Sequence, residues 1–437
     1  MTHGILEKCF KLRENSTTIK IEVIAGLTTF MTMAYILAVN PFILSKAGMN
    51  PSAVFTATAL SAAIGTIVMA FYANLPIGVA PGMGANAFFA FTVVIAMGNS
   101  WQFALTAVLF EGIIFIILTM CKIREAIVNC FSSGLKHAIS CGIGLFITFV
   151  GLINAGIVKT GNGVPLQLGD FKSAAVLLAI AGLIVTGVLL QKNIKGSLLI
   201  SILIITAIGI PLGVTKFQNG FSLISMPPSL SPIFCKFEWH KIFTADMAMT
   251  VIVLLFMELF DTIGTLLGVA TRAKLVDSKG NVKNIKQALM ADAVATTAGA
   301  ILGTSTVTAY VESTAGVAEG GKTGLTALTI AVLFLVSLFI SPIFLAIPTS
   351  ATSPILIIVG LFMLTPIKEL NFGDFSESIP FFLIMIMMPF SFSIADGIVI
   401  GTLAYVLLKT LSGKTKELNV VIIILAMLFA SKLIFLG

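Results

Sequence analysis

Acidic residues stand inside apolar stretches at two places in the chain. Glu258 and Asp261 lie three positions apart in FMELFDTIGTLLGVA, and therefore on one face of a helix. Glu312 lies in GTSTVTAYVESTAGVAEGG, among glycines and hydroxyl side chains. A carboxylate at the centre of a bilayer costs about 2.5 to 3.5 kcal/mol on insertion scales, so acids there usually mark a transport pathway. The alternative for each acid is a helix end that points toward water.

The chemistry open to these acids is hydrogen bonding and proton exchange. No Lys, Arg or His accompanies them in the predicted membrane core, and desolvation disfavours the ionised form, so they can take up protons. An ionised carboxylate accepts hydrogen bonds and repels anions, which favours a neutral ligand rich in N–H donors, or a cation. Because His3, His137 and His240 fall at ends or in loops, we expect no histidine relay, metal site or cofactor.

The roles of four further polar residues are left open by the sequence. Asp292 opens the ninth predicted span and is either a helix cap or a functional group. Asn86 either satisfies a neighbouring irregular backbone or binds the ligand. Asp396 is read as an N-terminal cap that follows Ser393 rather than as a ligand contact, and the role of Glu111 in the fourth span is open.

The composition defines the elements that must position these residues. The chain has 437 residues, of which 57% are hydrophobic and 10% charged, and its mean hydropathy is +1.08. Such a chain has too little polar surface for a soluble globule and is predicted to be an all-α polytopic membrane protein in a lipid bilayer. No GxxxxGK[ST] sequence occurs, which argues against ATP-driven pumping. The net charge of +7 is dispersed among loops, so no nucleic-acid partner is expected.

Hydropathy predicts about fourteen transmembrane segments. They are 22–45, 51–72, 81–97, 101–120, 137–157, 172–190, 195–214, 246–271, 285–303, 304–320, 323–347, 353–366, 379–393 and 395–410. The apolar stretch 419–436 is read as a helix along the interface, with a fifteenth span as the alternative.

Charge distribution predicts that the N-terminus is cytoplasmic. This orientation places nineteen Lys and Arg residues in the cytoplasm and six on the other face, in agreement with the positive-inside rule. The cytoplasmic set includes Lys122, Arg124, Lys274, Lys279 and Lys283. Of the five cysteines, among them Cys130, only Cys235 falls outside, where it has no disulfide partner; this agrees with a cell membrane (inner or plasma) location.

Two predicted segments are irregular at their starts. Segment 3, LPIGVAPGMGANAFFAF, is rich in Pro and Gly before Asn86, and segment 10 passes through Gly303, Thr304, Ser305 and Thr306 before a helix near Val311. Both are predicted to be partly extended and partly helical. Matching broken segments in two halves of a transporter are the best sequence indication of its binding site. Their separation predicts an inverted repeat of seven plus seven segments.

Four motifs in order resemble one known family over nearly the whole chain. They are AGLTTFMTMAYILAVNP (Ala25 to Pro41), APGMGANAFFAF (Ala80 to Phe91), FMELFDTIGTLLGVA (Phe256 to Ala270) and GTSTVTAYVESTAGVAEGGKTGL (Gly303 to Leu325). The chain resembles the nucleobase/cation symporters related to nucleobase-ascorbate transporters, in the azaguanine-type hypoxanthine/guanine permease branch.

The resemblance implies two domains that move against each other in alternating access. The core domain would comprise 1–135 and 246–350 (segments 1–4 and 8–11), and the gate domain 136–245 and 351–437 (segments 5–7 and 12–14 with the C-terminal apolar segment). The resemblance also implies a substrate site between segments 3, 8 and 10. The substrate-binding residues would be Asn86, Glu258, Asp261 and Glu312, and the proton-coupling residues Asp261, Asp292 and Glu312.

We therefore expect proton-coupled uptake of purine nucleobases, namely hypoxanthine and guanine, with adenine as an alternative. A flat neutral purine presents ring N–H groups that carboxylates accept, in keeping with the residues alone. The alternatives are a cation exchanger or channel that uses the same acids, and an integral-membrane enzyme, which the missing nucleophile and metal motifs disfavour. The oligomeric state is open, with a homodimer as the candidate.

Overall fold

The computed structural model describes residues 2–121, 132–161, 165–216, 222–273, 275 and 284–435. Lys122, Arg124, Cys130, Lys274, Lys279 and Lys283 lie outside the described residues. Each of the fourteen predicted spans coincides with one helix, with consecutive helices, or with a short strand followed by helix. The protein is an all-α membrane fold, and its described residues include two short strand pairs.

The elements follow in two series. The first half forms α1 (Thr2–Phe10), α2 (Ile19–Met33), α3 (Ile36–Lys46), α4 (Pro51–Val68), the π-helical turn η1 (Met69–Ala73), β1 (Val79–Pro81), α5 (Met83–Ala87), the π-helical η2 (Phe88–Ala96), α6 (Trp101–Met120), α8 (Ser133–Asn154), β2 (Val158–Lys159), β3 (Gln167–Leu168), α9 (Ala174–Gln191) and α10 (Ser197–Gly209). The second half forms η3 (Trp239–Lys241), α11 (Ala245–Arg272), α12 (Ile285–Leu302), β4 (Val307–Ala309), α13 (Ser313–Ala318), α14 (Gly324–Ser337), η4 (Leu338–Ile340), α15 (Ser341–Leu345), α16 (Thr349–Met363), η5 (Thr365–Glu369), α17 (Phe375–Phe390), α18 (Ile394–Leu411), η6 (Thr415–Glu417) and α19 (Val420–Phe435).

Polar caps set several helix starts. The side chains of Thr18, Asn50 and Ser100 each accept a backbone N–H in the first turn of α2, α4 and α6. Ser393 does the same for α18, and it accepts from the backbone N–H of Asp396. Asp396 therefore lies in the first turn of the helix, where a carboxylate is favourable, and the cap itself is Ser393.

The first span is broken in its middle. The helix α2 ends at Met33 and α3 begins at Ile36, so Ala34 and Tyr35 form the junction. The two helices together make one apolar span, Ile19–Lys46. The break turns the Tyr35 side chain toward the site described below.

The irregular starts of segments 3 and 10 pair with each other. β1 and β4 are antiparallel, with Val79 opposite Ala309 and Pro81 opposite Val307. Thr66 of α4 bonds through its hydroxyl to both the N–H and the C=O of Val79, and Thr296 of α12 bonds in the same way to Val307. Both extended stretches thus satisfy their backbone groups inside protein, as irregular backbone within a membrane must.

The two halves of the chain pack in corresponding ways, if each segment is compared with its counterpart seven segments away in the chain. α6 packs against α12 and α11, and its counterpart α14 packs against α4 and α2. α8 packs against α17, and its counterpart α16 packs against α9. Together with the antiparallel pairing of β1 and β4, this exchange is what an inverted repeat produces.

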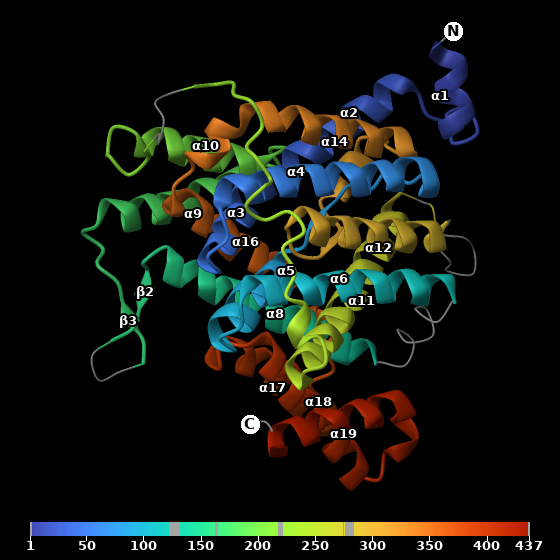
Figure 1. Ribbon diagram of the computed structural model, residues 1–437, viewed down its shortest axis with the longest axis vertical. Coiled ribbons are helices and arrows are strands. Elements are labelled where there is room, and N and C mark those ends of the chain that lie inside the picture. Colours follow the sequence, from blue (N-terminus) through green and yellow to red (C-terminus); the bar gives the residue numbers. More distant parts are fainter. Residues whose placement is uncertain are drawn as a thin grey trace.

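The helices form two groups. The elements from α2 to α6 and from α11 to α15 pack mainly on one another, and we call them the first helix group. α8 to α10 and α16 to α18 likewise pack mainly on one another and form the second helix group. Figure 1 shows α14, α4, α12 and α6 of the first group side by side, with the β2–β3 hairpin projecting on the opposite side from α1.

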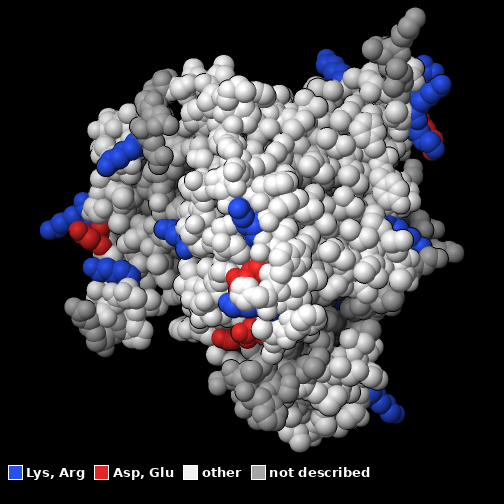
Figure 2. Space-filling view, in the orientation of Figure 1, with Lys and Arg blue, Asp and Glu red and all other residues white. Residues whose placement is uncertain are grey.

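The surface agrees with a membrane environment. Eight stretches of the described chain are long and apolar enough to cross a bilayer: Ile19–Lys46, Pro51–Ala73, Trp101–Met120, Ser133–Asn154, Ala174–Gln191, Gly324–Leu345, Thr349–Glu369 and Ile394–Leu411. Large apolar side chains such as Ile117 and Ile184 are exposed. Figure 2 shows a largely uncharged face, with the charged side chains gathered near the centre and toward the edges. An apolar surface of this extent needs lipid to cover it.

The C-terminal helix α19 packs against α18 at the edge of the bundle (Figure 1). Just before it, the buried ammonium group of Lys409 pairs with Glu377 and with Glu417. Lys414 pairs with Asp374 beside them. This ion-pair cluster ties the start of α17 to the end of α18. The location of 419–436 along the interface stays a prediction.

Candidate functional site

A small cavity lies between the two helix groups, beside the strand pair. Its volume is about 70 Å³. The first helix group contributes Tyr35, Gly82, Met83, Gly84, Asp261, Thr265, Thr308, Ala309, Tyr310, Val311 and Glu312, and α16 of the second group contributes Val359 and Met363. The predicted acids Asp261 and Glu312 therefore share one hollow, to which segments 1, 3, 8 and 10 all contribute.

Glu312 is held by a tyrosine that sequence reasoning did not select. The hydroxyl of Tyr35 donates to Glu312 Oε1 at 2.7 Å. Tyr35 is 1% exposed and stands at the junction of α2 and α3. The carboxylate thus has one oxygen fixed by a buried donor. A charge-assisted bond of this kind is roughly twice as strong as a neutral one.

Asp261 presents its side chain to the cavity from α11. It is an exposed residue although its helix lies inside the bundle, because it faces this hollow. Thr265, one turn further along α11, lines the same wall. The side of α11 that carries Asp261 and Thr265 is therefore directed at the site, as the sequence of the eighth segment predicts.

Glu258 and Asp292 lie deeper and do not line the cavity. Thr262 Oγ1 lies 2.8 Å from Glu258 Oε1 and 3.0 Å from Asp292 Oδ2. It also lies 3.0 Å from Thr308 Oγ1, and Thr308 belongs to the cavity wall. Asp292 is not a helix cap: α12 begins at Ile285, and Asp292 lies well inside it. Its carboxylate is part of a buried polar cluster.

The hydroxyls of the stretch before β4 all have side-chain partners. Asn40 donates to Thr304 at 2.8 Å, and Ser305 donates to Asn86 Oδ1. Thr306 donates to Glu111 Oε2 at 2.5 Å. These bonds fix the extended chain to α3, α5 and α6. They give Glu111 a structural partner and make Asn86 a bridge between segments 3 and 10.

The start of the helix in segment 3 faces the cavity. α5 and η2 form one continuous helical stretch, Met83–Ala96, and Gly82, Met83 and Gly84 line the hollow. The first N–H groups of a helix have no partner within it. The lining of the site thus includes both carboxylate acceptors and the start of a helix with its backbone donors. Among the described residues, no group of three or more His, Cys, Asp or Glu could hold a metal ion.

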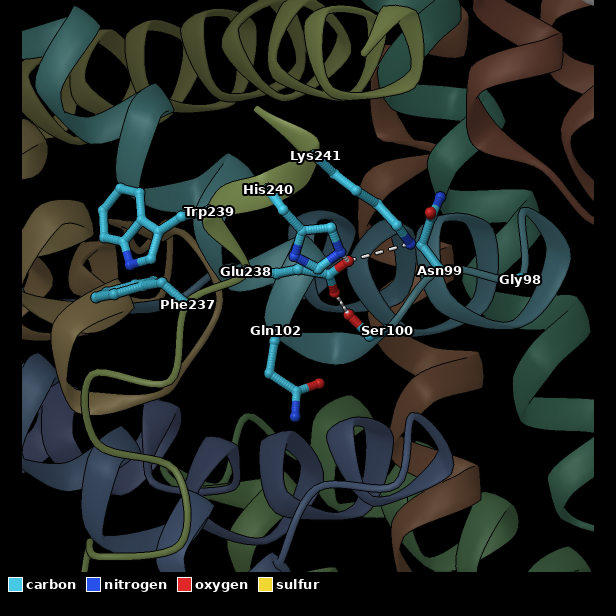
Figure 3. Close-up of a pocket in the computed structure, with 9 residues that line it drawn as sticks. All are labelled: Gly98, Asn99, Ser100, Gln102, Phe237, Glu238, Trp239, His240 and Lys241. Atoms are coloured by element: carbon cyan, nitrogen blue, oxygen red, sulfur yellow. Dashed lines mark hydrogen bonds and ion pairs between the residues drawn. The ribbon is translucent and has the colours of Figure 1, made fainter. Parts of the chain in front are cut away.

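A larger hollow of about 910 Å³ lies on the surface, where the loop before α11 meets the start of α6. Figure 3 shows Glu238 there, directed at Ser100 and Lys241. Burial raises the pKa of Glu238, but hydrogen bonds from Ser100 and Lys241 outweigh it and leave the pKa below its usual value. This carboxylate is already fully paired on an open surface. The hollow contains none of the acids within the membrane-spanning segments.

The fold is that of a multi-pass membrane transporter. The chain superimposes on the transmembrane domain of the cyanobacterial bicarbonate transporter BicA with a TM-score of 0.64 and 16% identity, covering 87% of this chain and 97% of that one. It superimposes on SLC26A9 with a TM-score of 0.64 and 12% identity, covering 94% and 69%. At these identities the likeness concerns the fold alone.

Residues 20–400 match the permease family Xan_ur_permease. The adenine permease AdeQ of Escherichia coli K12 is 41% identical over 431 residues, which cover 99% of this chain and 96% of AdeQ. The guanine/hypoxanthine permease PbuO of Bacillus subtilis is 42% identical over 432 residues, covering 98% and 100%. The chain belongs to this permease family. It is a transporter and not an enzyme.

Proposed function

We propose that this permease takes up purine nucleobases together with protons across the cytoplasmic membrane by alternating access. Hypoxanthine and guanine are the proposed substrates, with adenine as the alternative. The observation that carries the proposal is the shared hollow of Asp261 and Glu312 beside the paired strands. The similarity to adenine and to guanine/hypoxanthine permeases supports a purine.

The donors and acceptors of the site complement a flat neutral base. Glu312 and Asp261 accept ring N–H groups, and the backbone N–H groups at the start of α5, those of Met83 and Gly84, offer donors to a ring carbonyl oxygen. The N–H of Gly82 already donates to the carbonyl oxygen of Thr306. Asn86 and Glu258 support the site from behind, because their side chains bond to Ser305 and Thr262 rather than line the hollow. A site built around such bonds discriminates strongly against ligands that lack the matching group.

Opening of the site is assigned to relative movement of the helix groups. A cavity of about 70 Å³ is smaller than the roughly 300 Å³ of the smallest ordinary ligand sites, so the hollow has to widen to admit a base. We propose that the first helix group is the core domain (1–135 and 246–350) and the second the gate domain (136–245 and 351–437). The N-terminus is proposed to be cytoplasmic, and a homodimer is the candidate assembly.

Uptake of labelled adenine, guanine, hypoxanthine and uracil tests the function, in cells without their own carriers, with and without a protonophore. We expect purine uptake that the protonophore suppresses and an excess of unlabelled guanine reduces. Glu312→Gln should abolish uptake while the protein still inserts. Glu14→Gln is the matched control, because Glu14 is exposed, pairs with Lys11 and does not line the cavity. Undiminished hypoxanthine uptake by Glu312→Gln would refute the assignment of Glu312 to the substrate site.

A further inference from the structure

One buried hydroxyl has more partners than it has protons. Thr262 Oγ1 lies within hydrogen-bonding distance of Glu258, Asp292 and Thr308, at 2.8, 3.0 and 3.0 Å. All four side chains are at most 3% exposed. A threonine hydroxyl has one O–H to donate and two lone pairs with which to accept. It can donate to only one of the two carboxyl groups.

The second carboxyl group therefore has to bring its own proton. If both acids were ionised, one carboxylate oxygen would face a lone pair of Thr262 at hydrogen-bonding distance with no hydrogen between them, in a buried site. If one acid is protonated, it donates to Thr262, Thr262 donates to the other acid, and Thr308 donates to the remaining lone pair. That arrangement uses the one O–H and both lone pairs of Thr262.

The surrounding charges favour the same protonation state. In the described part of the chain, the charged groups that act on Glu258 are Asp292 of α12, Glu111 of α6 and Asp261 of its own helix, and all are acids. Glu312 adds a further negative charge near Asp261. Like charges gathered in one buried site disfavour ionisation of all of them together.

We infer that Glu258 and Asp292 share one proton through Thr262, and that Thr308 links this shared-proton site to the cavity. Transfer between the two acids conserves all atoms: one carboxyl gives its proton to Thr262 while Thr262 gives its own to the other. Thr308 belongs both to the cavity wall and to this cluster. A ligand that engages the Thr308 hydroxyl thus changes the bonding of the proton. This inference rests on the proposed function, and it assigns the coupling proton to a site behind the ligand.

Thr262→Val tests the inference, because valine keeps the shape of threonine and removes the hydroxyl. The purified protein is reconstituted in liposomes, and two rates are measured with labelled hypoxanthine. Counterflow without a pH gradient reports binding and alternation alone, and accumulation with the outside acidic reports proton coupling. We expect Thr262→Val to retain counterflow and to lose the stimulation by the gradient, and Thr262→Ser to restore it. Thr119→Val is the matched control, because Thr119 is buried and its hydroxyl donates within its own helix at 2.7 Å.

Stimulation of Thr262→Val equal to that of the wild type would overturn the inference. If Thr262→Val lacks counterflow, Asp292→Asn serves as the second test of the inference. The amide of asparagine can donate to Thr262 as the protonated acid does, but it carries no transferable proton. That variant should keep counterflow and lose stimulation, and loss of counterflow in both would show that the cluster serves ligand binding instead. Absence of counterflow in the wild type would refute the proposed function itself, which is a separate outcome.

Discussion

Replacing Tyr35 by phenylalanine removes the hydroxyl that donates to Glu312 Oε1. The bond is 2.7 Å long, and Tyr35 is 1% exposed, so water does not readily replace the hydroxyl. The ring stays in place, and the change is confined to one oxygen atom. We expect purine uptake with a higher KM, because Glu312 loses its fixed orientation toward the ligand.

The size of the effect follows from the charge on the acceptor. A hydrogen bond to a charged group contributes about 1.5 to 3 kcal/mol. Since about 1.4 kcal/mol corresponds to a factor of ten, KM should rise roughly 10- to 150-fold. The rise in KM is smaller than this range if the freed carboxylate oxygen accepts a hydrogen bond from another donor.

The concentration dependence of labelled hypoxanthine uptake, normalised to the amount of protein in the membrane, measures this effect. Tyr72→Phe is the matched control, because Tyr72 is 57% exposed and does not line the cavity. A Tyr35→Phe variant with the KM of the wild type would refute the view that Tyr35 positions Glu312.

Two further predictions concern stability. Gly324→Ala should lower the melting temperature in detergent, because its Cβ would lie 2.0 Å from the backbone oxygen of Ala70, and such overpacking costs about 1 to 3 kcal/mol. Gly187→Ala is the control, because a Cβ at Gly187 would have no atom within 4 Å. Equal melting temperatures of the two variants would contradict the packing argument. Hydrogen bonds from Lys414 and then Ser376 hold the pKa of Asp374 below its usual value, so its stabilising effect is present above the unfolded pKa of about 3.9 and is lost as the pH falls toward the folded value. Asp374→Asn should therefore flatten the acid side of a plot of melting temperature against pH, and an unchanged slope would exclude this source of acid sensitivity.

Local sequence features predicted much of the fold. Length and hydropathy located the spans, since a membrane helix is defined by its own residues. The Pro and Gly residues before Asn86 and the Gly303–Thr306 stretch indicated extended chain, because such residues break helices wherever they stand. Asp261 and Glu312 were both predicted for the site, and both line one cavity.

Features that depend on partners far away in the chain could not be predicted from the sequence. Tyr35 and Glu312 are 277 positions apart, and nothing local shows that they meet. A signal was nevertheless present, since the chain has 34 Phe but only 4 Tyr, so a hydroxyl on an aromatic ring within a span is unusual. Asp292 was open between cap and function, although the predicted span and α12 both begin at 285, because its partner Thr262 lies 30 positions away in another helix. Its partner Thr262 was seen only as a neighbour of the acids.

The hydroxyl bonds from Thr66 and Thr296 have a mechanical consequence. Each threonine fastens one strand to a long helix of its own repeat, through both the N–H and the C=O of a single residue. Neither strand can leave its helix without breaking the two bonds to its threonine, and the pairing of β1 with β4 joins the two strands to each other. We therefore expect the strand pair and the bound base to move as one rigid unit with α4 and α12. Val359 and Met363 of α16 would form the stationary wall along which this unit moves.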